Sequence, residues 1–423
     1  MREQIASTLS ISFSRRDVLR AGVVGGVALA GIGRAATGSE PDLPPVRTIT
    51  RGPKFYWFGY YDKFEFDPTN RYVLGMQVDF EHRSPSSQDS ISIGMVDLHD
   101  GDRWIDLGRS SAWCWQQGCM LQWIPGSQSE ILWNDRDGDH FCCRMIDVQS
   151  RKMRTIPHPI YTLSPDGKSG LSLDFGRLND TRPGYGYAGV SDPYADQLAP
   201  ENSGIYRIDM ATGSQEMIVS LAEIAASGRR METMEGAKHK FNHLLFSPDG
   251  SRFIFLHRWT GPKGRETRMF TATPEGKDLR IIDDNGLTSH FIWRDPQHIL
   301  ALSRQRSHGM RFYLFEDGGQ RSIEVIGEDA MTSDGHCSYL PNVDWILNDT
   351  YPQDGFQHVY LYHVPTQRQI CLGHFRAPPQ YAGEWRCDTH PRSSRDGRMV
   401  VIDAPEASSG RQLHLIDING VVG

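Results

Sequence analysis

The sequence predicts an all-β protein, a seven-bladed β-propeller closed by an N-terminal strand. Three observations support this fold. Glycine (42) and proline (24) are spread through the 423 residues, which favours short strands and turns over helices. A unit of roughly 40 to 80 residues recurs seven times, a period typical of repeat architectures. The last unit ends after its third strand, so its missing strand must come from elsewhere in the chain.

Each unit contains an extended segment, a polar turn, a β-rich segment and further strands up to a second turn. The first turns lie at residues 67–70, 124–127, 164–167, 247–250, 294–297, 340–343 and 394–397. Four strands that cannot bury both faces alone form a propeller blade, and radial closure protects the sheet edges. Residues 46–50 are predicted to supply the outer strand of the last blade. Two insertions stand out, a loop at 176–204 and a short helix at 221–226.

The N-terminus predicts export. Arg15 and Arg16 precede a weakly apolar run at 21–33 and small residues at 34–36, the layout of a twin-arginine signal. We therefore expect residues 1–36 to be a signal peptide read by the Tat export machinery. Residues 37–423 would form a single propeller domain, exported to the periplasm or secreted. No later apolar run approaches ~18 residues, so no membrane insertion is expected after cleavage.

Composition narrows the classes of partner. The formal net charge of -7 gives no basic footprint for a phosphate backbone, so no nucleic-acid partner is expected. The chain is 38% hydrophobic, enough for a large core, and we expect a monomer. The seven cysteines contain no CxxC pair, and burial is favoured over disulfides or a zinc site.

Four histidines occupy one repeat position. Counting back five residues from the second residue of each turn gives His243, His290, His336 and His390 in units four to seven. The same position holds Lys63, Met120 and Ile160 in the first three units. This position lies near the start of the innermost strand, so the four imidazoles should converge on one mouth of the central channel.

Converging neutral imidazoles are natural ligands for Mn, Fe, Ni or Zn. Asp388 lies two residues before His390 on the same strand face and adds a carboxylate. Mixed nitrogen and oxygen ligands favour Mn²⁺ or Fe²⁺ over Ca²⁺, and Zn²⁺ also fits such a site. A proton relay or a purely structural cluster uses the same residue types, so these alternatives stay open.

Four motifs carry a family resemblance: residues 242–248 (NHLLFSP), 289–293 (SHFIW), 335–338 (GHCS) and 389–393 (THPRS). In order and spacing they resemble the His motifs of the oligogalacturonate lyases, which are manganese-dependent seven-bladed propellers. The match covers roughly residues 240–404. The resemblance implies that His243 is the general base and that His290 and His390 are metal ligands, with His336 as a further ligand.

The chain departs from the family pattern at two ligand positions. Asp388 stands where the family has a histidine, and Trp385 stands where it has a glutamine ligand. Asp388 could ligate in place of the histidine. No motif aligns with the family's catalytic arginine, so Arg229 and Arg230 are left unassigned.

We expect several further residues to contact substrate. Lys63 shares the histidine register and could pair with an anion, although a salt bridge to a neighbouring carboxylate is an equal alternative. Gln117 precedes the inner strand of the second unit, where aromatic side chains and amides could hold sugar rings or simply pack between blades. The third-unit loop adds Arg177, Arg182, Tyr185 and Tyr187, either as a lid or as solvated residues.

These predictions favour an exported, metal-dependent lyase that cleaves an acidic oligosaccharide by β-elimination. A divalent cation on a uronate carboxylate would stabilise the developing charge while His243 takes the neighbouring proton. The alternative is a non-catalytic TolB-like propeller that binds glycans or envelope proteins. A glycoside hydrolase would need two carboxylates across a sugar site, and the repeat position exposes only Asp388 and Asp62.

Overall fold

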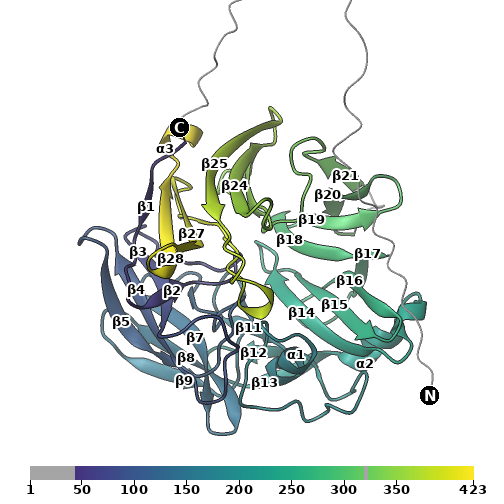
Figure 1. Ribbon diagram of the computed structural model, residues 1–423. Helices are drawn as coiled ribbons and strands as arrows, with labels where there is room; N and C mark the ends of the chain where they lie inside the picture. Colours follow the sequence, from purple (N-terminus) through teal and green to yellow (C-terminus); the bar gives the residue numbers. More distant parts are fainter. Residues whose placement is uncertain (1–42, 319–322) are drawn as a thin grey trace, which may run out of the picture. The chain divides into compact units, whose positions relative to one another are not determined.

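The computed structural model describes residues 43–318 and 323–423. Their strands form seven four-stranded antiparallel sheets, each built from neighbouring strands in chain order except the last. Figure 1 shows these sheets arranged around a common centre as propeller blades. The predicted all-β seven-bladed fold is confirmed. The predicted signal peptide at 1–36 lies outside the described residues.

The strand bounds, blade by blade, are as follows. Blade one contains β2 (Phe55–Trp57), β3 (Tyr72–Val78), β4 (Ile91–Asp97) and β5 (Arg103–Ser110). Blade two contains β6 (Gln122–Trp123), β7 (Glu130–Asp137), β8 (His140–Asp147) and β9 (Met153–Ile156). Blade three contains β10 (Thr162–Leu163), β11 (Ser169–Ser172), β12 (Gly204–Asp209) and β13 (Gln215–Ser220). Blade four contains β14 (Lys238–Phe246), β15 (Phe253–Gly261), β16 (Gly264–Ala272) and β17 (Arg280–Gly286).

The remaining blades follow the same order. Blade five contains β18 (Thr288–Asp295), β19 (His298–Gln305), β20 (Gly309–Glu316) and β21 (Ile323–Ile326). Blade six contains β22 (Ser338–Tyr339), β23 (Trp345–Asp349), β24 (Phe356–His363) and β25 (Arg368–Arg376). Blade seven contains β26 (Arg392–Ser393), β27 (Met399–Glu406), β28 (Gly410–Asp417) and β1 (Val46–Thr48).

Blade seven closes the ring by joining the two ends of the propeller. Strand β1 pairs antiparallel with β28, with Val46 opposite Ile416 and Thr48 opposite His414. The pairing continues past the strand, where the Ile49 backbone N–H donates to the Leu413 carbonyl at 2.9 Å. The prediction that an N-terminal segment supplies the missing strand is confirmed.

A buried ionic network also joins blades seven and one. Arg392 of β26 donates to Glu65 at 2.9 Å and to Asp403 of β27 at 2.9 Å. Asp403 in turn accepts from the backbone N–H groups of Phe58 and Gly59, which follow β2. Burial raises the pKa of Glu65 to about 7, and the Arg392 charge opposes this rise. Each member therefore depends on the others for a buried partner.

Tryptophans fill the space between blades one and two. The Trp57 ring lies 5.5 Å from that of Trp113 and 5.2 Å from that of Trp115, centroid to centroid, and all three are buried. Trp113 and Trp115, the aromatic side chains just before Gln117, therefore pack between blades, the second of the two roles considered for this segment. All seven cysteines are free, and six of them are buried, as burial without pairing predicts.

The insertions are partly as predicted. The helix at 221–226 is present as α2 (Leu221–Ala226). The segment predicted as a loop at 176–204 instead begins in α1 (Phe175–Thr181), because the Asp174 carboxylate caps the N-terminus by accepting from the Arg177 backbone N–H at 2.9 Å.

The other helices are short: α3 (Asn419–Val422) and the 3₁₀ turns Glu232–Met234 and Gly383–Trp385. Among the described residues, no helix has the length and apolar character needed to cross a membrane.

Replacing Arg392 tests the closing network. Arg392→Ala leaves two carboxylates buried without their cation, so the free energy of unfolding should fall by about 3–5 kcal/mol. The measurement is the shift of the unfolding transition in denaturant, compared with Arg398→Ala, whose side chain is exposed. Equal shifts in the two variants would show that the network does not hold the ring closed.

Candidate metal centre

Four histidines from consecutive blades meet near the centre of the ring. His243 lies in β14 and His290 in β18, while His336 and His390 each lie two residues before their blade's first strand. The His336 ring centroid is 4.3 Å from that of His290 and 4.2 Å from that of His390. The centroid of the Tyr61 ring lies 5.7 Å from that of His243 and 5.4 Å from that of His336. The convergence predicted from the repeat position is present.

The backbone at this position is unusual. His243 and His390 have positive φ angles of 53° and 40°, and Met120 at the same repeat position has 56°. A non-glycine residue in this region costs about 1–3 kcal/mol and marks a constrained site. Next to His336, a Cβ on Gly335 would lie 1.9 Å from the Asp349 carbonyl oxygen, so only glycine allows this approach.

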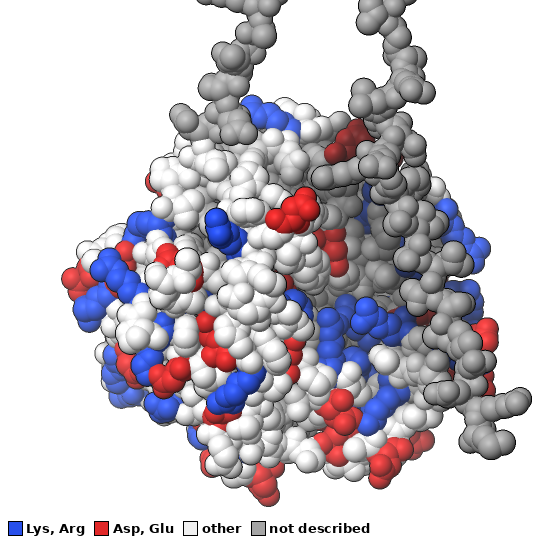
Figure 2. All heavy atoms as spheres, in the orientation of Figure 1, with Lys and Arg blue, Asp and Glu red and all other residues white. Residues whose placement is uncertain are grey.

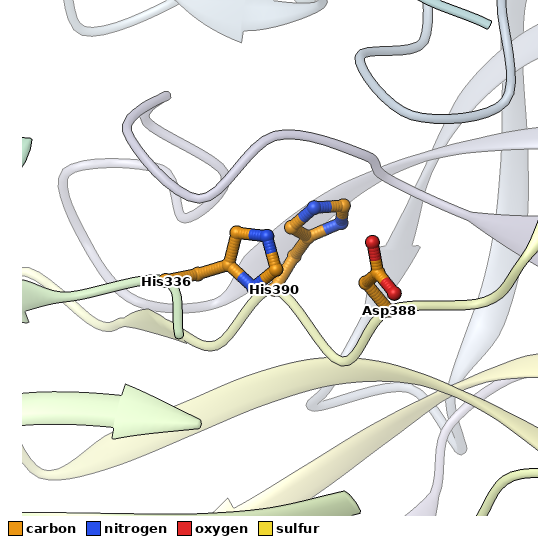
Figure 3. A group of neighbouring side chains, drawn as sticks. All are labelled: His336, Asp388 and His390. Atoms are coloured by element: carbon orange, nitrogen blue, oxygen red, sulfur yellow. The ribbon is translucent and has the colours of Figure 1, made fainter. Parts of the chain in front are cut away.

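His336, Asp388 and His390 form a buried group whose ligand atoms all lie within 4.8 Å of one another. Figure 3 shows the two imidazoles and the carboxylate gathered in one place. Ligand atoms bound to one ion at ~2.0–2.2 Å are at most about 4.4 Å apart. Side-chain adjustments of a few tenths of an ångström would therefore let these three groups share one cation.

Asp349, the last residue of β23, orients two members of this group. Its carboxylate oxygens lie 2.9 and 3.0 Å from His336 Nδ1 and accept the backbone N–H of His390 at 3.1 Å. A carboxylate on one ring nitrogen fixes the imidazole and leaves Nε2 to bind a metal. Burial lowers the pKa of His336, but the charge and hydrogen bond of Asp349, together with the charges of Asp388 and Asp334, raise the net pKa.

Burial favours the neutral form of the neighbouring histidines, His390 and His290. His390 Nε2 is buried and finds no hydrogen-bond partner among the described residues, so its lone pair or proton is left unsatisfied. Burial, with the neighbouring His336 charge, holds the pKa of His390 well below its usual value. His290 Nδ1 lies 2.8 Å from Asp334, a second carboxylate–histidine pair, and burial lowers the pKa of His290. The donor set fits a divalent cation.

Asp388 differs from the other members because it already has a cationic partner. Arg386 Nε donates to Asp388 at 2.6 Å, and Arg386 Nη2 donates to the Tyr185 hydroxyl at 2.7 Å. A metal ion would compete with Arg386 for this carboxylate. Trp385 supplies no ligand, since its indole N–H donates to the Gln380 carbonyl at 3.1 Å.

His243 lies beside this group with a different environment. Its ring stacks on Phe291 at 3.9 Å, and its Nε2 lies 3.2 Å from Asp62 Oδ2. The other ring nitrogen, Nδ1, lies 3.4 Å from the Tyr60 hydroxyl. Burial lowers the pKa of His243 to about 4 although Asp62 opposes the shift, so the ring is neutral at neutral pH. With Nε2–H donated to Asp62, Nδ1 is the nitrogen that can accept a proton.

A cationic cleft of about 570 Å³ adjoins the histidines. Arg182, Lys240, Arg258 and Arg265 line it, together with Asp334, which holds His290. Figure 2 shows Lys and Arg side chains gathered along a hollow in this face of the molecule. Burial and the neighbouring Arg258 lower the pKa of Lys240 to about 7. Burial and Arg182 lower the pKa of Arg258 to about 10. The cleft holds these four cations against two carboxylates, Asp334 and Glu266, which favours an anionic occupant.

Four of the residues predicted to contact substrate are engaged inside the protein. Lys63 pairs with Asp62 at 3.0 Å and is buried, the alternative role considered for it. Gln117 is buried and donates to the Tyr161 hydroxyl at 2.7 Å.

The side chains of Arg177 and Tyr187 are also held by contacts within the protein. The five N–H donors of Arg177 bond Asp192 and the backbone carbonyls of residues 194, 197, 198 and 239, so none is left for a substrate. Tyr187 stacks on Phe175 at 4.3 Å and accepts from Asn134 at 3.0 Å. Because all three side chains are buried and bonded within the protein, we assign Gln117, Arg177 and Tyr187 to packing, although Gln117 Oε1 has no partner among the described residues.

Arg182 and Tyr185 lie nearer to the candidate centre. The Arg182 guanidinium lies 3.9 Å from the Tyr185 ring and also lines the cationic cleft. Tyr185 reaches Asp388 through Arg386. These two residues therefore connect the third-blade insertion with the carboxylate of the metal group.

Sequence reasoning missed the residues that support the centre. Asp334 lies two residues before His336, a spacing that could have indicated a second carboxylate at the repeat position. Lys240 and Arg258 are direct partners in the β14–β15 register, and neither carries a motif. Asp349 comes from the second strand of its blade, so only the pairing of β22 with β23 brings it to the histidines.

Comparisons with known proteins place the fold. No family model matches the chain, and no curated protein matches it in sequence. Among solved structures, an oligogalacturonate lyase from Vibrio parahaemolyticus matches with a TM-score of 0.60 and 13% identity, covering 88% of this chain and 93% of that one. An oligogalacturonate lyase in complex with manganese matches with a TM-score of 0.62 and 13% identity, over the same shares of the two chains. A puromycin-hydrolyzing peptidase from Mycobacterium tuberculosis matches with a TM-score of 0.52 and 14% identity, but over 51% of that chain.

Fold and site together define a seven-bladed β-propeller with a buried His/Asp/His group suited to a metal ion. Over most of its length, the chain is similar in structure to oligogalacturonate lyases.

Metal affinity tests the candidate centre. His390→Ala should abolish Mn²⁺ binding because it removes a ligand. Asp349→Asn should weaken binding about 10–100-fold, because it releases the orientation of His336. Isothermal titration with Mn²⁺ on the metal-free protein measures both effects, with the exposed Asp354→Asn as the matched control. Unchanged affinity in His390→Ala would place the metal elsewhere.

Proposed function

We propose that the protein is a divalent-cation-dependent polysaccharide lyase that cleaves a uronic-acid-containing glycan by β-elimination. The observation that carries the proposal is the buried group of His336, Asp388 and His390, placed beside a cationic cleft and a neutral histidine. The likeness of the fold to oligogalacturonate lyases, one of them solved with manganese, supports the same reaction class.

The donor set favours Mn²⁺ as the cofactor, with Fe²⁺ and Zn²⁺ as alternatives, because imidazole and carboxylate ligands are mixed. His336, Asp388 and His390 would hold the ion, and His290 lies next to them as a further ligand. When bound, the ion would neutralise negative charge that develops on the uronate carboxylate.

In our proposal, His243 removes the proton from the carbon beside that carboxylate. Asp62 holds Nε2–H, so Nδ1 receives the proton from the side of the Tyr60 hydroxyl. The new imidazolium would be stabilised by the Asp62 carboxylate, in the way a buried acid supports a general base. The electron pair of the broken C–H bond forms the new carbon–carbon double bond, the C4–O bond breaks as the 4-linked sugar leaves, and the leaving oxygen takes a proton from solvent.

The cationic cleft would bind the acidic oligosaccharide. Arg182, Lys240 and Arg258 supply charged donors, and Asp334 and Tyr351 join the cleft to the histidines. Charged donors in a partly desolvated site form the stronger hydrogen bonds to carboxylates.

We further propose that the twin-arginine segment at 1–36 directs export to the periplasm, or secretion, where such a glycan would be met. The protein would act there as a monomer, without a nucleic-acid partner.

A direct assay tests the reaction. The purified protein with Mn²⁺ is incubated with a panel of uronide oligomers, and unsaturated product is followed by near-ultraviolet absorbance. We expect turnover by the wild type and none by His243→Ala, which should keep its metal because it removes no member of the metal group.

Two results would contradict the proposal. Loss of metal in His243→Ala would make that residue a ligand and leave the base unidentified. Absence of turnover with every uronide, despite bound metal, would favour the alternative of a non-catalytic TolB-like propeller.

The charge of Lys240 predicts a pH dependence of substrate binding. Because its pKa is about 7, Lys240 is charged below pH 7 and loses its proton as the pH rises through 7. KM for an anionic substrate should therefore rise between pH 6 and 8, by about tenfold if one charged hydrogen bond is lost. In Lys240→Arg the charge persists, so the rise should disappear. An equal rise in both proteins would exclude Lys240 from binding.

A further inference from the structure

A second cavity lies at the opposite end of the inner strands. It has a volume of about 370 Å³ and is lined by residues that follow the histidines along the chain, among them Trp293, Ser338, Tyr339 and Arg395. These residues lie two to five positions beyond His290, His336 and His390, and a strand rises ~3.3 Å per residue. Tyr61 and Asp62, which contact the histidines, also line this far cavity, but none of His336, Asp388 and His390 does.

The side chains that line the far cavity leave one positive charge, that of Arg395, without an ion-pair partner among the described residues. Lys63 is paired with Asp62 at 3.0 Å, and Arg392 is paired with Glu65 and Asp403. Arg395 has no ion pair among the described residues; its Nε donates to the Phe66 carbonyl at 3.2 Å. Burial lowers the pKa of Arg395 to about 10, and the charge of Asp67 opposes this shift only in part. The guanidinium thus leaves the cavity with unmet positive charge.

The walls of the far cavity combine aromatic rings with an unsatisfied hydroxyl. Phe64, Trp293 and Tyr339 line it, and Phe64 is 45% exposed although the Arg395 guanidinium lies 3.5 Å from its ring. Ser338 Oγ is buried and finds no hydrogen-bond partner in the described part of the chain. Aromatic faces pack against the apolar face of a ring, while hydroxyl and guanidinium groups bind its polar edge.

We propose that the far cavity is a binding site for a monomeric sugar carboxylate. The aromatic walls would hold the ring, Arg395 would pair with the carboxylate, and Ser338 Oγ would bind a ring hydroxyl. The volume lies near the lower end of the range for small-molecule sites, which fits one ring better than a polymer. The site is distinct from the metal group and does not require the lyase reaction.

The experiment distinguishes uronate binding in the far cavity from uronate binding in the cationic cleft. Binding of D-glucuronate and D-galacturonate is measured by isothermal titration in chelator, using the full-length Lys240→Gln variant to weaken the cationic cleft. We expect uronate binding in this background and a loss of at least about tenfold with Arg395→Gln added, because a charged hydrogen bond is removed. Arg398→Gln, an exposed arginine three residues further on, is the matched control and should bind normally.

A second variant tests the far cavity without changing Arg395, so that the result does not depend on the folding of one variant. Ser338→Leu fills the cavity without touching Arg395 and should cause the same loss. The proposal is overturned if no uronate binds in the Lys240→Gln background, if Arg395→Gln binds as well as Arg398→Gln, or if D-glucose binds as tightly as the uronates. A protein without lyase activity would still show the predicted binding, so the two proposals fail independently.

Discussion

Ring closure is the constraint on which the rest of the structure depends. The pairing of β1 with β28 completes the seventh sheet, and Arg392 joins Glu65 to Asp403 across blades one and seven. Since every blade packs only on its two neighbours, an open ring would let the first strands splay apart. Closure brings histidines from residues 243 to 390 to one place, and it gives the inner strands two distinct ends.

Neighbouring carboxylates determine which ring nitrogen of each histidine is free to bind a metal or a proton. Asp349 and Asp334 hold the Nδ1 atoms of His336 and His290, which leaves their Nε2 atoms for a ligand. Asp62 instead holds Nε2 of His243 and leaves Nδ1 beside Tyr60. The histidines at one repeat position therefore take two roles. Those whose Nδ1 contacts a carboxylate can bind a metal through Nε2, and His243, whose Nε2 contacts a carboxylate, can act as a base through Nδ1. His243 and His390 share the positive-φ backbone of this repeat position.

Much of the fold followed from the sequence because propeller blades repeat. The turns, the closing strand and the histidine position all recur at one place in the unit, and the structure shows all three. The supporting residues did not follow, because they carry no repeat signal. Asp349 acts from a second strand, and Lys240 meets Arg258 only through cross-strand pairing. The loop position of Arg177 and Tyr187 indicated lid residues, but Arg177 is buried in helix α1 and Tyr187 stacks on Phe175 of that helix, so both bond the protein itself.

The central claim is that His336, Asp388 and His390 share one divalent cation. Anomalous diffraction from crystals soaked in Mn²⁺ tests it most directly, because the ion is located without reference to activity. We predict one strong anomalous peak within about 2.0–2.5 Å of all three side chains, with Asp388 released from Arg386. A peak held by other residues, or none beside the His390 ring, would contradict the account.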